Sequence, residues 1–93
     1  MVVASSQLDL FFPESQSLKD KRHLVKSLID RIRGKFNVSI AEIDCNDLWQ
    51  RSILGVVLVT NDVGYAHTVL SKVVDYVEQD GRVHLVDYSF EVL

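Results

Sequence analysis

The chain has 93 residues, of which 47% are hydrophobic and 25% charged, a balance typical of one globular domain with a single core. The single cysteine excludes an internal disulfide, and the formal net charge of −3 argues against general attraction to nucleic acid. No apolar run approaches the ~20 residues that cross a bilayer, and no basic segment opens a secretory signal, so we expect a cytoplasmic protein.

The first half of the chain predicts a strand, a helix and a second strand. Alternating apolar residues over 2–12 are typical of a half-buried strand. Ser17 and Asp20 stand at capping-box spacing before a helical apolar stripe, so a helix begins there, and Gly34 is well placed to end it. Residues 36–43 predict the second strand, in which a break in alternation indicates a bulge.

The second half predicts a strand, a helix and a last strand. Residues 53–60 are apolar on both faces, as in a central strand. Asn61 or Asp62 can cap a second helix, which the Asp-Gly pair at 80–81 stops. A last strand begins at Arg82, with alternate apolar residues on one of its faces.

Two helices with one apolar stripe each can bury both stripes on the same face of one sheet. Right-handed crossovers then favour two interleaved βαβ units. We therefore expect residues 1–93 to form a single α+β domain, a ferredoxin-like βαββαβ sandwich with a four-stranded antiparallel sheet and two helices on one face. The helix-free face would carry Val3, Phe11 and part of 53–60, and such an apolar patch makes a homodimer through this face plausible.

The charge of the chain is strongly polarised. Seven of the ten basic residues lie between positions 18 and 35, where the only acids are Asp20 and Asp30. Four of these cations fall within a band of roughly 60° on the first helix and form a basic ridge, suited to phosphate groups. The alternative is a solvated face in which Asp30 pairs with Lys26 and Arg33. The basic ridge consists of Lys19, Arg22, Lys26 and Arg33.

The topology also places two loops together. Because the first two strands run parallel, the start of the first helix should share a rim with the loop that contains Trp49. Trp49 either stacks on a base or anchors a protein partner, or it folds back over the core. Arg51 either contacts phosphate or pairs with Asp47. The candidate nucleic-acid contacts are therefore Lys19, Lys21, Arg22, Lys26, Arg33, Trp49, Gln50 and Arg51.

No catalytic or metal-binding pattern is recognisable. His23, His67 and His84 lie on separate predicted elements without ligand spacing, and Cys45 has no evident activating histidine. The strand over 53–60 carries no aromatic residue, which argues against base stacking on the sheet as in an RNA-recognition motif. We therefore expect neither an enzyme nor a protein that needs a metal or another cofactor.

Four segments carry a resemblance to a known family. They are Ser-Leu-Lys-Asp-Lys-Arg at 17–22, Val-Lys-Ser-Leu at 25–28, Phe-Asn-Val-Ser at 36–39 and Asp-Leu-Trp-Gln-Arg at 47–51. Together they resemble the YlxP-like family, small bacterial proteins of unknown function, from about residue 8 to the C-terminus. The resemblance implies a ferredoxin-like fold. It also implies genes that often lie near those of translation initiation and ribosome maturation factors.

These patterns lead to one main hypothesis and two rivals. The main hypothesis is a non-enzymatic binding module that associates with structured RNA or a ribosomal subunit through the basic first helix and the Trp49 loop. The first rival is a homodimeric protein-interaction or regulatory domain that binds no nucleic acid. The second is a domain that binds a small ligand at a dimer interface.

Overall fold

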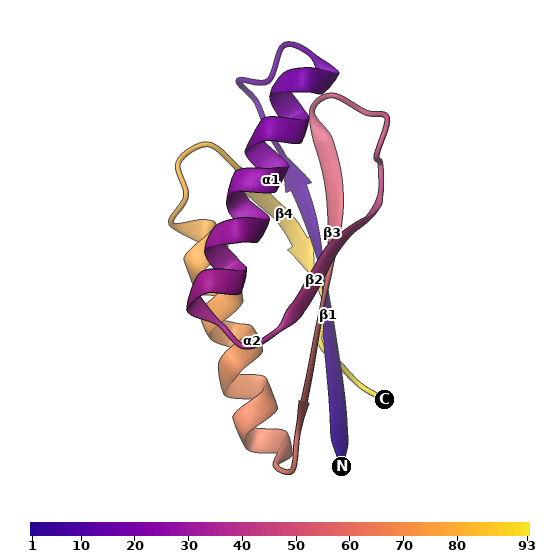
Figure 1. The fold of residues 1–93 in the computed structure, drawn as a ribbon, viewed down its shortest axis with the longest axis vertical. Helices are drawn as coiled ribbons and strands as arrows, with labels where there is room; N and C mark the ends of the chain where they lie inside the picture. Colours follow the sequence, from indigo (N-terminus) through magenta and orange to yellow (C-terminus); the bar gives the residue numbers. More distant parts are fainter.

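The computed structural model describes residues 1–93 and places both helices on one face of a single sheet (Figure 1). The sheet is antiparallel and has the order β2-β3-β1-β4, with β1 and β3 in the centre, while β5 also pairs with β1. The predicted α+β, ferredoxin-like sandwich is confirmed, although the last predicted strand is divided in two. The elements are β1 (Val2–Phe11), α1 (Leu18–Lys35), β2 (Ser39–Asp44), β3 (Arg51–Thr60), α2 (Val63–Glu78), β4 (His84–Tyr88) and β5 (Glu91–Val92).

Both helices begin at the predicted caps. The hydroxyl of Ser17 accepts the backbone N–H of Asp20 at 3.0 Å, and the carboxylate of Asp62 accepts that of Tyr65 at 2.9 Å. The first helix runs one residue past its predicted end, because Gly34 does not adopt the left-handed conformation that would terminate it. Neither helix combines the length and the apolar composition that a bilayer-spanning segment needs.

The core lies between the helices and the sheet. From Ala4 to the adjoining Phe12, the even-numbered residues of β1, including Leu8 and Leu10, point toward the helices and are buried. The odd-numbered residues, such as Val3 and Phe11, lie on the helix-free face and are only half-buried. This alternation, as predicted from the sequence, gives one cluster of 17 buried apolar residues.

Bulges interrupt both edges of the sheet. The register between β2 and β3 shifts between Glu42 and Asp44, which confirms the bulge that the broken alternation predicts. The register between β1 and β4 also shifts, so that Val86 becomes an extra residue. Tyr88 and Val92 pair with Leu8 and Ala4 and so lie on the helix side of the sheet, where Phe90 contacts His67 of α2. The apolar face expected for the last strand is therefore formed without Val86, although the large apolar side chains over 86–92 stay exposed.

Candidate nucleic-acid interface

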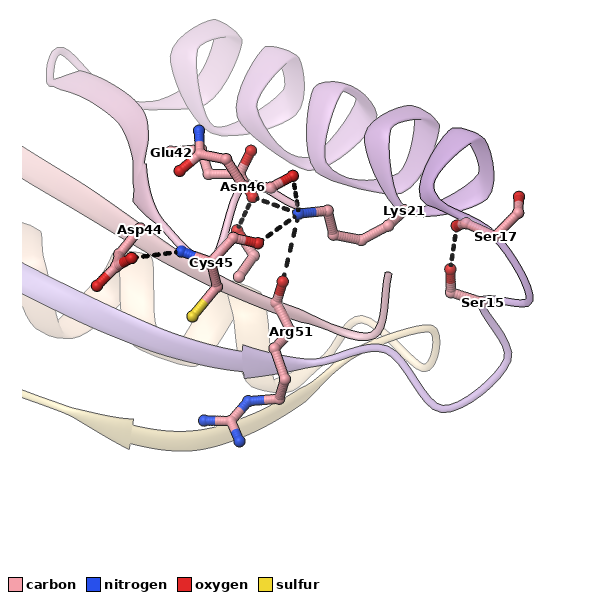
Figure 2. Close-up of polar contacts among 9 residues, drawn as sticks. Ser15, Ser17, Lys21, Glu42, Asp44, Cys45, Asn46 and Arg51 are labelled. Atoms are coloured by element: carbon pink, nitrogen blue, oxygen red, sulfur yellow. Dashed lines mark hydrogen bonds and ion pairs between the residues drawn. The ribbon is translucent and has the colours of Figure 1, made fainter. Parts of the chain in front are cut away.

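The start of α1 and the loop between β2 and β3, residues 45–50, lie at the same end of the domain, as the topology predicts (Figure 1). Lys21 joins them directly (Figure 2). Its ammonium group donates hydrogen bonds to the carbonyl oxygens of Cys45 and Asn46 in the loop, at 2.9 and 3.1 Å. A further contact of 3.3 Å reaches the carbonyl oxygen of Arg51, the first residue of β3. The helix start and the loop are therefore held as one unit.

The prediction that Lys21 contacts nucleic acid from the surface is wrong. Its side chain is 0% exposed, and its ammonium group pairs with the carboxylate of Glu42 at 2.8 Å. The same carboxylate oxygen accepts the hydroxyl of Ser52 at 2.6 Å. A buried charge needs such partners, so Lys21 organises the loop instead of meeting a ligand. The sequence does indicate the burial of Lys21, because this residue precedes the buried Val25 and Leu28 by four and seven positions and so lies on the same face of the helix.

Gln50 also has a structural role. Its side-chain amide donates to the carbonyl oxygens of Pro13 and Ser15, at 3.3 and 3.2 Å. The backbone N–H of Phe12 donates in turn to the carbonyl oxygen of Gln50, at 2.8 Å. Gln50 thus ties the loop after β1 to the loop before β3, and its amide nitrogen is already engaged.

Arg51 lies on the other face of the sheet from the helices. Its guanidinium group points away from α1 (Figure 2) and pairs with Asp9 on β1 at 2.7 Å, so the alternative pairing with Asp47 is wrong. The hydrogen bond that Arg51 donates to Asp9 raises the pKa of Arg51 above its usual value. Because the sheet separates it from the basic ridge, Arg51 does not extend that surface.

Trp49 is half-exposed, at the end of the domain where α1 begins. Its exposed fraction is 49%, and that of the neighbouring Leu48 is 50%. The backbone of the loop forms a turn, in which the N–H of Leu48 donates a hydrogen bond to the carbonyl oxygen of Cys45 at 3.1 Å. Cys45 itself has a φ of 60°. The carboxylate of Asp44 accepts the N–H of Cys45 at 2.7 Å. An anchored loop therefore presents a half-exposed indole.

A shallow groove of about 380 Å³ runs between α1 and β2 and contains three of the four ridge cations, Arg22, Lys26 and Arg33. The guanidinium group of Arg33 donates to the carbonyl oxygen of Ile40 on β2 at 3.0 Å. Lys26 pairs with Asp30 at 2.8 Å, as predicted, and this hydrogen bond lowers the pKa of the Asp30 carboxyl group. We call this feature the basic groove.

The basic groove keeps an excess of positive charge. Its two carboxylates are Asp30, which pairs with Lys26, and Glu42, whose charge the buried Lys21 offsets. Arg22 takes part in none of the four ion pairs of the protein, and neither does Lys19, which continues the same helical stripe toward the loop. Two of the ridge cations are thus free to meet an anion. No group of three or more His, Cys, Asp or Glu side chains is arranged to hold a metal ion.

These features define a class of protein, a small ferredoxin-like α+β domain with a cationic helix beside the outer edge of its sheet. The chain belongs to the family described as "Protein of unknown function (DUF503)", whose sequence profile matches residues 3–90. It is 30% identical to "Uncharacterized protein YlxP" of Bacillus subtilis (strain 168) over 77 residues. This match covers 83% of this chain and 84% of the relative. The family resemblance seen in the sequence is confirmed.

Proposed function

We propose that this protein is a non-catalytic RNA-binding module that associates with structured RNA, such as that of a ribosomal subunit. The single observation that carries the proposal is the basic groove, in which Arg22, Lys26 and Arg33 follow one side of α1 beside an edge strand. Cations that displace counterions from phosphates supply much of the affinity for nucleic acid. Because these cations are clustered, an acidic protein can still attract a polyanion locally.

The helix-free face of the sheet is less suited to RNA than the α1 side. On β3 its residues include Ile53, Val57 and Val59, none of which is aromatic. Asp9 and Asp87 stand opposite each other on β1 and β4. Asp9 pairs with Arg51, but Asp87 is in none of the ion pairs and leaves this face with negative charge. Phosphate groups would be repelled there and bases would find little to stack on. The α1 side, by contrast, combines exposed cations with a neighbouring loop that carries the half-exposed Trp49.

The proposal is tested by reversing two exposed charges, in the double variant Lys19→Glu/Arg22→Glu. We expect its affinity for ribosomal RNA to fall by about tenfold or more, because two phosphate contacts become repulsive. A matched control, Arg31→Glu/Lys72→Glu, changes the net charge equally at exposed positions outside the basic ridge and should bind like wild type. The measurement is a binding titration at fixed salt, with circular dichroism to confirm folding. Equal affinities for both double variants would refute the proposal.

A second candidate is a homodimeric interaction domain joined through the helix-free face. The observation that favours it is apolar surface left in water by Val57 and Val59, with Ile43 on the neighbouring strand lying over Gly55. Analytical ultracentrifugation should then show a dimer that Val59→Asp converts to a monomer. A wild-type monomer throughout the accessible concentration range would exclude this candidate.

A further inference from the structure

The cations of the basic ridge form a line instead of a patch. Lys19, Arg22, Lys26 and Arg33 share one helical stripe, and the fourteen steps between the first and the last span roughly 21 Å at ~1.5 Å per residue. At one end, Arg33 is fixed to the start of β2 through the carbonyl oxygen of Ile40. At the other end, Lys19 lies in the first turn of α1, beside the anchored loop. A line one side chain wide matches one phosphate backbone.

A group suited to base stacking lies near one end of this line. The Trp49 loop is tied to the first turns of α1 through the contacts of Lys21 with the carbonyl oxygens of Cys45 and Asn46. Since the loop is already ordered, binding would not have to immobilise it, and this saves free energy. A cationic track that follows the backbone, together with an aromatic side chain on which a base stacks, is the combination typical of proteins that bind single strands.

A duplex fits this surface less well. Double-stranded RNA is recognised across its minor groove by contacts to both strands, which requires cations spread over two dimensions. Beside the cations, the basic groove is lined by the apolar Val25 and Ile29 and by two paired carboxylates. These are Asp30, which pairs with Lys26, and Glu42, which pairs with Lys21. Arg31, the other exposed arginine of α1, is on a different side of the helix, near Asp80. The pKa of Asp80 is lowered mainly by its hydrogen bond with Arg82 and, to a smaller extent, by the charge of Arg31. No second row of cations is therefore available for a second strand.

We infer that the basic groove binds a single-stranded segment of RNA, such as a loop or an end, with its backbone along the basic ridge and one base stacked on Trp49. Stacked nucleotides advance about 3.4 Å each, so the line accommodates about six of them, or fewer in an extended strand. The inference rests on the proposed function and specifies the form of RNA that the site takes.

Trp49 is the only tryptophan in the chain, so its fluorescence reports directly on this contact. The full chain is titrated with oligouridylates of about two to about twelve nucleotides. It is titrated in parallel with an RNA duplex of about the same length. We expect single strands to quench the Trp49 emission, and their affinity to rise with length up to about six nucleotides and then level off. We expect the duplex to bind at least about fivefold more weakly.

The variant Trp49→Leu, followed with end-labelled RNA, should lose on the order of 5- to 100-fold in affinity for the single strand. Its matched control is Tyr65→Leu, which removes an exposed aromatic ring from α2 and should bind like wild type. An unchanged affinity of Trp49→Leu would overturn the base contact. Duplex that binds as tightly as single strand, and is lost with Lys19→Glu/Arg22→Glu, would overturn the inference but leave the proposed function. Absence of binding to either RNA would overturn both.

Discussion

Replacing Lys21 by alanine is expected to lower the free energy of unfolding by about 3–5 kcal/mol, the cost of breaking a buried ion pair by removing one partner. The carboxylate of Glu42, at 16% exposure, would lose its counter-charge and keep only the hydroxyl of Ser52. Three backbone carbonyl groups would also lose a donor. These are the carbonyl groups of Cys45, Asn46 and Arg51.

Urea unfolding followed by circular dichroism measures this loss. Lys19→Ala is the matched control, because Lys19 lies on the same helix with an exposed side chain, and its effect should stay within about 0.5 kcal/mol. Lys21→Met keeps most of the side-chain volume and should be nearly as destabilising as Lys21→Ala. Comparison of the two variants separates the contribution of the charge to the free energy of unfolding from that of side-chain packing. If Lys21→Ala were as stable as Lys19→Ala, the structural role assigned to Lys21 would be wrong.

The second large effect is expected at the end of β1, where two phenylalanines point to opposite faces of the sheet. Phe12 is 1% exposed within the core, so Phe12→Ala should cost about 3–5 kcal/mol through the cavity that it leaves. Phe11 lies half-buried on the helix-free face beside His84, and Phe11→Ala should cost about 1 kcal/mol. Both values come from chemical denaturation of the two variants under identical conditions. If Phe11→Ala and Phe12→Ala lowered the free energy of unfolding equally, the helix-free face would not be exposed to solvent, and the homodimer would be favoured.

Most of the fold could be predicted because local patterns agree with one another. The capping residues Ser17 and Asp62 stand before apolar stripes of helical period, and β1 alternates between buried and more exposed residues from Ala4 onward. Two features of the last strand could not be predicted, its division at residues 89–90 and the bulge at Val86. That bulge is a property of the pairing between β1 and β4, and one strand read alone does not reveal it.

The candidate site could be predicted only in outline. The shared rim follows from topology, and the loop that carries Trp49 does lie next to the start of α1. For Lys21 and Arg51, the position in the helix or strand indicates the role of the side chain better than its positive charge does. Lys21 continues the buried stripe of its helix, and Arg51 alternates with the buried Ser52 and therefore faces away from the helices. Its partner Asp9 depends on the register of β1 with β3, which a single strand does not encode.

Burial of Lys21 also shapes the charge of the basic groove. Glu42 lines this groove, and without a counter-charge its carboxylate would repel a phosphate backbone. The Lys21–Glu42 ion pair offsets that charge from inside, and Asp30 pairs with Lys26, so the excess positive charge of the groove comes from Arg22 and Arg33. One lysine therefore serves both the loop that carries Trp49 and the cationic character of the neighbouring surface.

The salt dependence of RNA affinity tests most directly whether the basic ridge meets phosphates. For a single strand, the slope of log K against log salt changes by about 0.7 for each phosphate contact. Loss of the two contacts made by Lys19 and Arg22 should therefore flatten the slope by about 1.4 in Lys19→Glu/Arg22→Glu. The control Arg31→Glu/Lys72→Glu should keep the wild-type slope. The same slope in the wild type and in both double variants would contradict the account.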